Sequence, residues 1–219
     1  MFDQATVAML MEGVVDTLYM TIVSTFFSYV FGIVMAVVLV ICRKDGIRPN
    51  PVVYSVLDVV VNLTRSFPFL ILMIAVIPFT RYIVGTTIGN NATVVPLVIA
   101  AAPFVARLIE SSLLEVDNGV VEAAQSMGAS RLQIVWKVYL PEAVPSLILG
   151  ASISIITILG YTAIAGAVGA GGLGDLAIRY GYQRFNNEVM FGTVLILVAM
   201  VQGVQMAGDR LVRRLAHRR

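Results

Sequence analysis

Hydrophobic residues are arranged along this chain in long unbroken runs, separated by shorter polar stretches. A helix needs about 20 mainly apolar residues to cross the hydrocarbon part of a bilayer. Five runs meet or approach that length, and we expect membrane spans at residues 17–41, 53–83, 92–109, 144–168 and 189–206. A β-barrel would show short segments of alternating polarity instead. The pattern therefore predicts an all-α polytopic membrane protein with five transmembrane helices.

The composition agrees with this class. Of the 219 residues, 58% are hydrophobic and only 13% are charged, which is more apolar than a soluble domain needs. The single cysteine, Cys42, excludes an internal disulfide, and with one histidine, His217, no metal site is expected. Neither an internal repeat nor a low-complexity linker divides the sequence, so we expect one transmembrane domain over residues 1–219.

The second predicted span is the least regular, because polar residues and two prolines interrupt it. We expect residues 53–66 to form a helix near the cytoplasmic surface and residues 67–79 to cross the membrane. Arg65 stands at the boundary, and a cation at the bilayer centre costs about 2.5 to 3.5 kcal/mol on insertion scales. Two interpretations of Arg65 stay open. It pairs with Asp58 or with interfacial lipid, or it makes a polar contact in a transport pathway.

Basic residues predict the orientation, because they gather on the cytoplasmic side of membrane proteins. Placing residues 110–142 inside puts most of them there, namely Arg43, Lys44, Arg48, Arg107, Arg131, Lys137, Arg210, Arg213, Arg214, Arg218 and Arg219. The amino terminus is then outside, the carboxyl terminus is inside, and residues 1–13 are expected at one surface. Since these cations follow the membrane boundaries and are not interleaved with aromatic residues, no nucleic acid is expected as a partner.

The longest polar interruption, residues 110–142, is predicted to contain two short helices. An Asp-Asn pair precedes the first helix, and Gly128 stands where its end favours the left-handed conformation. Ser130 and Gln133 have the spacing of a capping box for the second helix. Pro141 is expected to end that helix.

The first of these helices has a small, weakly charged surface. Ala123 and Ala124 allow the backbone of a partner to approach closely, and Glu122 adds one charge. On spacing alone, the segment is either a surface hairpin without a partner or a docking element.

The sequence EAA at residues 122–124, followed by Gly128 and by Leu-Pro at residues 140–141, resembles the EAA loop of ABC-transporter permeases. Val138 replaces the isoleucine that is usual in that loop. The resemblance implies a coupling helix that docks in a groove on a separate ATPase subunit. The implied ATPase-coupling residues are Glu122, Ala123, Ala124 and Gly128.

Patterns of catalytic chemistry are missing or out of context. Gly169, Gly171 and Gly174 match G-x-G-x-x-G, but a membrane helix rather than a strand is expected before them, which rejects a dinucleotide site. These glycines are expected to let the backbone bend and pack closely. The sequence contains no P-loop, and its histidine lies in the tail, away from any triad. We therefore expect neither a catalytic site nor a cofactor in this chain.

Other segments resemble the permease subunit of the methionine ABC importer family. They are RSFPF at residues 65–69, GYTAIAGAVGAGGLGDLAIRYGYQRF at residues 160–185 and VQGVQMAGDRLVRRL at residues 201–215. The resemblance implies a type I importer fold in the bacterial cytoplasmic (inner) membrane, with a homodimer forming the pathway for methionine. It also implies two cytoplasmic ATP-binding subunits, which hold the ATP and Mg²⁺, and an extracytoplasmic substrate-binding lipoprotein.

Tyr161 and Ile164 lie near the outer end of the fourth predicted span. Side chains there usually pack in the core, but in a dimer with facing fourth spans they would close an outer gate. Together with Arg65 they are the candidate pathway residues. Three alternatives stay open: a permease of the same class for another small amino acid or polar solute, a membrane scaffold, and a channel that works without ATP.

Overall fold

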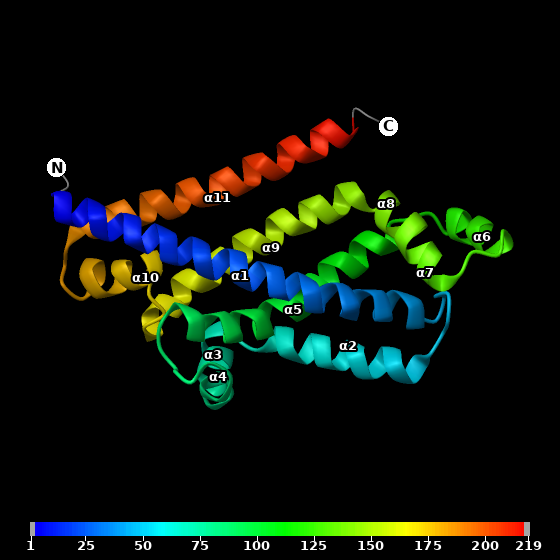
Figure 1. Ribbon diagram of the computed structural model, residues 1–219, viewed down its shortest axis with the longest axis horizontal. Helices are drawn as coiled ribbons and strands as arrows, with labels where there is room; N and C mark the ends of the chain where they lie inside the picture. Colours follow the sequence, from blue (N-terminus) through cyan, green and yellow to red (C-terminus); the bar gives the residue numbers. More distant parts are fainter. Residues whose placement is uncertain (1–2, 217–219) are drawn as a thin grey trace.

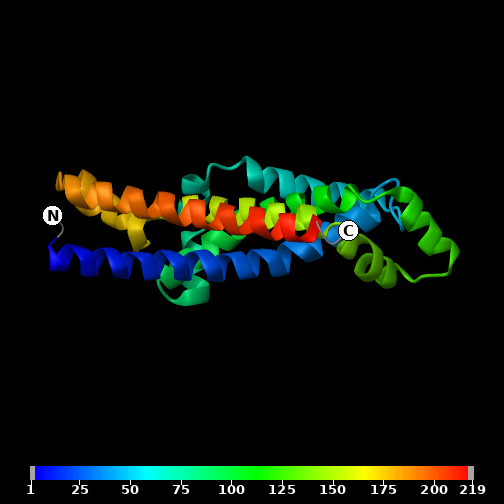
Figure 2. The same ribbon diagram turned by 90° about the horizontal axis from the view of Figure 1, so that it is seen from above.

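The computed structural model describes residues 3–216, and all regular structure in that range is helical. Residues 1–2 and 217–219 lie outside it, including Arg218 and Arg219 of the predicted cytoplasmic tail. The long helices run side by side along one axis, and short helices lie at both ends and beside the middle (Figure 1). Figure 2 shows the same elongated bundle from above.

Fourteen helical segments follow one another between residues 3 and 216. They are α1 (Gln4–Cys42), α2 (Pro51–Ser66), α3 (Phe69–Ala75), α4 (Ile77–Val84), α5 (Asn90–Leu114), α6 (Asn118–Ser126), α7 (Arg131–Ile134), the π-helix η1 (Val135–Tyr139), α8 (Leu140–Glu142), α9 (Val144–Ala165), the 3-10 helix η2 (Gly166–Val168), α10 (Gly172–Leu176), the π-helix η3 (Ala177–Tyr182) and α11 (Asn187–Ala216). Within residues 3–216, four helices are long and apolar enough to cross a membrane, and the bent pair α2–α3 makes a fifth candidate. The predicted all-α polytopic fold is confirmed.

α1 differs from the expected span at its beginning. Its 39 residues form one helix from Gln4 onward, so residues 4–13 belong to the same helix as the expected span at residues 17–41. These first turns have a packing partner, because Leu10 is buried with Leu173 and Leu176 of α10. At 1.5 Å per residue, α1 is about 58 Å long.

The region of the second predicted span also differs from the expectation. α2 runs along the bundle beside α1 and α5, and α3 turns away from it by 105°. Phe67 and Pro68 between them have extended backbone, since a residue before proline is pushed out of the helical region. The chain here has a lengthwise helix, α2, followed by two short helices set across its end (Figure 1).

α5 lies at the centre of the bundle, where it contacts α1, α2, α4 and α9. Small buried residues such as Ala101 and Ala106 allow this close packing. α9 and η2 together cover residues 144–168, which are the bounds of the fourth predicted span. On α9, Ser154 is fully buried and its hydroxyl oxygen lies 3.4 Å from that of Tyr29 on α1. The core therefore forms along the line where α1, α5 and α9 meet.

Candidate functional site

Residues 115–143 form a helical hairpin beyond the ends of the long helices (Figure 1). Asp117 caps its first helix by accepting a hydrogen bond from the backbone of Gly119 at 2.6 Å. Gly128 has a φ of 78°, so the chain turns there in the left-handed region that glycine adopts without strain. Ser130 and Gln133 cap each other's backbone in a full capping box. The predicted capping box and the conformation of Gly128 are confirmed.

The prediction that Pro141 ends the second helix is wrong. The helical path continues from α7 through η1 into α8, and breaks only at Ala143. Pro141 lacks an N–H, and in a regular α-helix its ring would meet the carbonyl of Lys137. The preceding residues form wider π turns instead, in which the Leu140 amide donates to the Val135 carbonyl. This widening makes room for the proline inside the helix.

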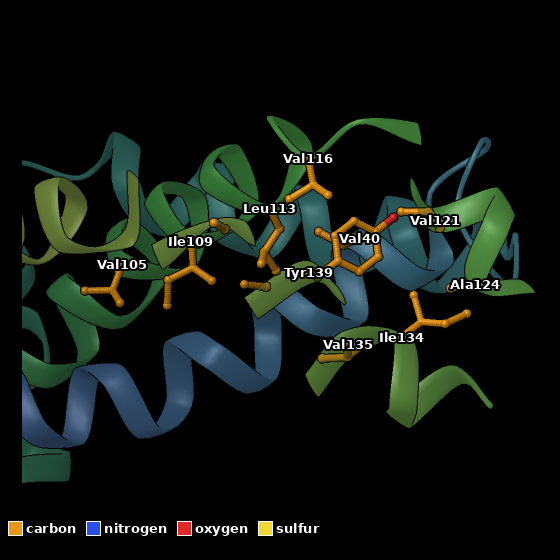
Figure 3. Close-up of a cluster of buried hydrophobic side chains, with 12 residues drawn as sticks. Val40, Val105, Ile109, Leu113, Val116, Val121, Ala124, Ile134, Val135 and Tyr139 are labelled. Carbon is orange, nitrogen blue, oxygen red and sulfur yellow. The ribbon is translucent and has the colours of Figure 1, made fainter. Parts of the chain in front are cut away.

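A continuous apolar cluster seats the hairpin on the bundle. Figure 3 shows its side chains in a row from α5 to α6. Burying each large apolar side chain contributes about 1.5–3 kcal/mol, and burial also raises the pKa of the Tyr139 phenol. The members of this hairpin cluster are Ala36, Val40, Val105, Ile109, Leu113, Val116, Val121, Ala124, Ile134, Val135, Tyr139 and Ala143. The hairpin is therefore a packed extension of α5 and α1 rather than a loose connection.

The four predicted coupling residues do not all face outward. Ala124 is only 6% exposed and belongs to the hairpin cluster, so it holds α6 in place and is not available to a partner. Glu122, Ala123 and Gly128 are exposed. The hairpin also exposes large apolar side chains that the sequence analysis did not identify, namely Val120, Met127, Leu132 and Trp136. Leu132 and Trp136 are four residues apart, a spacing that could have indicated a second apolar face.

Two of the three candidate pathway residues meet in one cavity, which we call the Arg65 cavity. Its volume is about 130 Å³, and it lies where α2 ends and α3 begins. Tyr161 reaches it from α9 and stacks on Phe69, with ring centroids 4.4 Å apart. Ile164 is 44% exposed and does not line it. The lining residues are Thr64, Arg65, Phe67, Phe69, Leu72, Ala100, Phe104 and Tyr161.

Arg65 does not pair with Asp58, so that part of its first interpretation is wrong. Asp58 forms an ion pair with Arg107 of α5, and Arg107 also donates to Glu110 at 2.6 Å. Asn62 accepts a further hydrogen bond from Arg107. No carboxylate among residues 3–216 forms an ion pair with Arg65, whose side chain is exposed. The sequence analysis did not predict that the ion pair of Arg107 with Asp58 joins α5 to α2, because these two residues are far apart in the sequence.

The opposite end of the bundle carries a second insertion, the glycine-rich residues 166–186. Gly166 and Gly174 leave no space for a side chain, since a Cβ on Gly174 would overlap the backbone of Ala163. Thr17 of α1 accepts a hydrogen bond from the Leu173 amide at 2.9 Å. Of the three glycines predicted to let the chain bend and pack closely, Gly174 is confirmed in close packing against backbone, and Gly171 meets the Asn90 side chain. Gly169 has a φ of 82° but only an ordinary contact with Ile88. Among residues 3–216, no group of three or more His, Cys, Asp or Glu side chains is placed to hold a metal ion.

A bundle of helices long and apolar enough to cross a membrane, with a helical hairpin packed on one end, defines the class of this protein as a multi-pass integral membrane protein. The chain belongs to the family of binding-protein-dependent transport system inner membrane components, whose family model matches residues 28–219. It is therefore a multi-pass permease subunit of the bacterial inner membrane and not an enzyme.

Individual relatives match over nearly the whole chain. The probable D-methionine transport system permease protein MetI of Vibrio cholerae is 50% identical over 210 residues, which cover 96% of this chain and 93% of that protein. The methionine import system permease protein MetP of Bacillus subtilis is 44% identical, with 95% and 94% covered. A solved chain from inward-facing conformations of the MetNI methionine ABC transporter matches with a TM-score of 0.96 at 47% identity, with 97% and 99% covered.

Proposed function

We propose that this chain is the permease of an ATP-driven importer that carries methionine across the bacterial inner membrane. Two copies form the pathway, each copy docks one cytoplasmic ATPase subunit, and an extracytoplasmic lipoprotein delivers the substrate. The observation that carries this proposal is the hairpin, which a buried apolar cluster seats on the bundle and which exposes other apolar side chains on its outside. The names of the relatives at 50% and 44% identity support methionine as the solute.

In the proposed mechanism, the hairpin transmits movement of the ATPase to the bundle. Glu122, Ala123 and Gly128, together with exposed Met127 and Trp136, form the contact with the ATPase. Ala124 acts from inside, as part of the hairpin cluster that reaches α5 and α1. Because the sequence has no P-loop, ATP and Mg²⁺ bind to the partner.

The proposed orientation places the hairpin in the cytoplasm and the glycine-rich insertion outside. The skew of basic residues supports it, and so does the position of these two elements at opposite ends of the bundle (Figure 1). Gln125 and Gln183 are exposed positions at the two ends. In a Cys42→Ser background, an impermeant thiol reagent should label Gln183→Cys in intact cells but not Gln125→Cys. Labelling of Gln125→Cys from outside would show that the topology is the reverse of the proposed one.

In the proposed dimer, Ile164 forms part of the outer gate and Tyr161 is its neighbour. Ile164 is 44% exposed on α9, an unfavourable state for a large apolar side chain unless lipid or another copy covers it. The solved chain from inward-facing conformations matches this structure closely, and that is the state in which an outer gate is closed. Ile164→Cys should therefore cross-link two copies in the resting complex. If Ile164→Cys fails to cross-link in every nucleotide state, the two α9 helices do not meet at this position.

The decisive test is reconstitution of the chain with its ATPase and binding protein in liposomes. We expect ATP-dependent uptake of methionine and no ATP hydrolysis by the chain alone. Uptake of a different solute under the same conditions would identify a permease of the same class with another substrate. Uptake without ATP would identify the chain as a channel. If no ATPase subunit binds the chain, the interpretation as a membrane scaffold would remain.

A further inference from the structure

We propose that the Arg65 cavity is a carboxylate-binding subsite in the translocation pathway, where the guanidinium of Arg65 holds the carboxylate of a passing amino acid. The inference rests on the proposed function, because it assigns the charged end of the transported solute to one residue of the chain. It begins with the position of Arg65 in the bundle.

Arg65 is the penultimate residue of α2, and α2 ends near the middle of the bundle, away from both ends (Figure 1). A guanidinium at such depth is strongly disfavoured in hydrocarbon and is found facing protein or a water-filled space. Arg65 is exposed in the single chain. It therefore faces a pathway or a second copy of the chain rather than the lipid.

Within residues 3–216, no carboxylate side chain pairs with Arg65, although the last turn of α2, where Arg65 lies, carries partial negative charge. The acidic residue on the same helix, Asp58, is bound to Arg107, and Glu110 is bound to that arginine as well. No described carboxylate remains in an ion pair with Arg65. An arginine without a counter-ion at this depth binds an anion favourably, and its planar group binds both oxygens of a carboxylate.

The walls of the cavity suit the rest of a methionine molecule. Aromatic rings of Phe67, Phe69, Phe104 and Tyr161 line it, and the stacking of Tyr161 on Phe69 fixes the orientation of both rings. Thioether sulfur makes favourable contacts with aromatic rings, and an ammonium group is attracted to their faces. Aromatic rings beside one cation match an amino acid with an apolar side chain and a carboxylate better than they match a sugar.

The size of the cavity indicates a transit site rather than a storage site. Its volume of about 130 Å³ is below the range of about 300–1,000 Å³ that is usual for pockets that enclose a whole ligand. Tyr161 lies three residues before Ile164, so a carboxylate in the cavity sits about one helical turn from the proposed gate. We therefore expect weak, brief binding that orients the solute after it passes the gate.

The first test measures the cavity directly, without transport. Thr64 lines it and is replaced by cysteine in a Cys42→Ser background, in complexes with the ATPase in lipid nanodiscs. A negatively charged thiosulfonate reagent should react with Thr64→Cys about tenfold faster than a positively charged one, and Arg65→Gln should abolish the difference. Methionine should slow the labelling, whereas methioninol, which lacks the carboxylate, should not.

The second test measures uptake in liposomes. Arg65→Gln should lower methionine uptake about tenfold, and Arg65→Lys, which keeps the charge, should restore part of it. Arg81→Gln is the matched control, because Arg81 is exposed on α4 and does not line the cavity. Its uptake should stay within about twofold of the wild type, as expected for a surface substitution.

The outcomes separate this inference from the proposed function. Absence of methionine uptake by the wild type would overturn the proposed function. The subsite would then be tested only by whether methionine, but not methioninol, protects Thr64→Cys from labelling. Normal uptake by Arg65→Gln, or equal protection by methionine and methioninol, would overturn the subsite and leave the importer intact. Reduced uptake by Arg65→Gln, without protection of Thr64→Cys by methionine, would indicate that Arg65 binds a lipid headgroup. This outcome would also overturn the subsite.

Discussion

The two insertions at opposite ends of the bundle are held by different kinds of contact. Large side chains such as Ile134 and Tyr139 seat the hairpin, residues 115–143. In the glycine-rich insertion, residues 166–186, Gly166 and Gly174 bring backbone directly against backbone. Side chains can change rotamer when a neighbour moves, but two backbones in contact cannot shift without a clash. The hairpin end is therefore able to adjust, and the glycine end is fixed to α9 and α1.

The surfaces of the two ends both combine apolar and charged side chains. The hairpin exposes apolar Met127, Leu132 and Trp136, which suit a protein partner that excludes water. A cavity of about 180 Å³ at the glycine end is lined by Glu12, Asp16 and Asp175 together with apolar residues, and Asp175 pairs with Arg179. The glycine-rich insertion also exposes Tyr182 and Phe185, and a cavity of about 310 Å³ at the hairpin is lined by Glu115, Asp117 and Glu142. The two ends therefore differ in what holds them in place rather than in the polarity of their surfaces.

The largest expected effect is at the glycine end. Gly174→Val places a side chain on the backbone of Ala163, and overpacking of this kind costs about 1–3 kcal/mol or more where the neighbours cannot move. We expect little folded protein in size-exclusion chromatography and a much lower melting temperature in detergent. Gly203→Val is the control, since a Cβ there meets no atom within 4 Å. A Gly174→Val protein that melts like Gly203→Val would show that close backbone packing does not hold this end.

An effect confined to one element, the hairpin, is expected for a change in the hairpin cluster. Ile134 is 1% exposed, and Ile134→Ala should cost about 2–5 kcal/mol through lost burial and the cavity left behind. The hairpin should become sensitive to protease while the bundle stays folded. Leu132→Ala, at an exposed position two residues earlier, should keep the resistance of the hairpin and weaken only ATPase co-purification. Equal protease sensitivity of the two variants would contradict the division into an inner and an outer face.

The effect of Gly128→Val should be on coupling rather than on folding. No atom lies within 4 Å of a Cβ at Gly128, so the cost comes from its φ of 78°, about 1–3 kcal/mol for a β-branched residue. We expect membrane insertion to survive and methionine uptake per ATP hydrolysed to fall, with Gly128→Ala milder. Wild-type uptake and assembly from Gly128→Val would mean that the hairpin is only a connector.

The smallest effect is expected for Glu122→Gln, which removes one exposed charge. A surface charge contributes about 0.2–1 kcal/mol, so ATPase binding should weaken by about twofold to fivefold at unchanged expression. Salt screens such contacts, and the wild type should therefore lose affinity with rising salt more steeply than Glu122→Gln. Parallel salt curves for the two proteins would remove Glu122 from the contact.

The elements that the sequence predicted well depend on local information. The fourth span, residues 144–168, ends where the apolar run meets Gly169, whose φ of 82° stops the helix. The capping box of Ser130 and Gln133 follows from residues three apart. In both cases the residues that decide the structure are neighbours in the chain.

The elements that were missed depend on contacts between distant segments. α1 continues through residues 4–13, where Leu10 and Gly13 pack against α10, and a hydropathy pattern reports membrane depth rather than helix length. The ion pair of Arg107 with Asp58 joins residues that no local pattern connects. The inner face of α6, with Ala124 buried, is defined only once the hairpin has packed on α5.

α1 touches both ends of the molecule. Its early residue Leu10 packs against α10 of the glycine-rich insertion, and its late residues Ala36 and Val40 belong to the hairpin cluster. The structure shows no break in the helix between these points, and an unbroken helix resists bending because every turn is hydrogen-bonded to the next. α1 is thus one stiff helix that packs against a different insertion at each of its ends. If the ATPase tilts α1 at the hairpin, where it is proposed to dock, the other end of α1 moves in the opposite direction. That other end lies at the glycine-rich insertion, where the substrate is proposed to arrive.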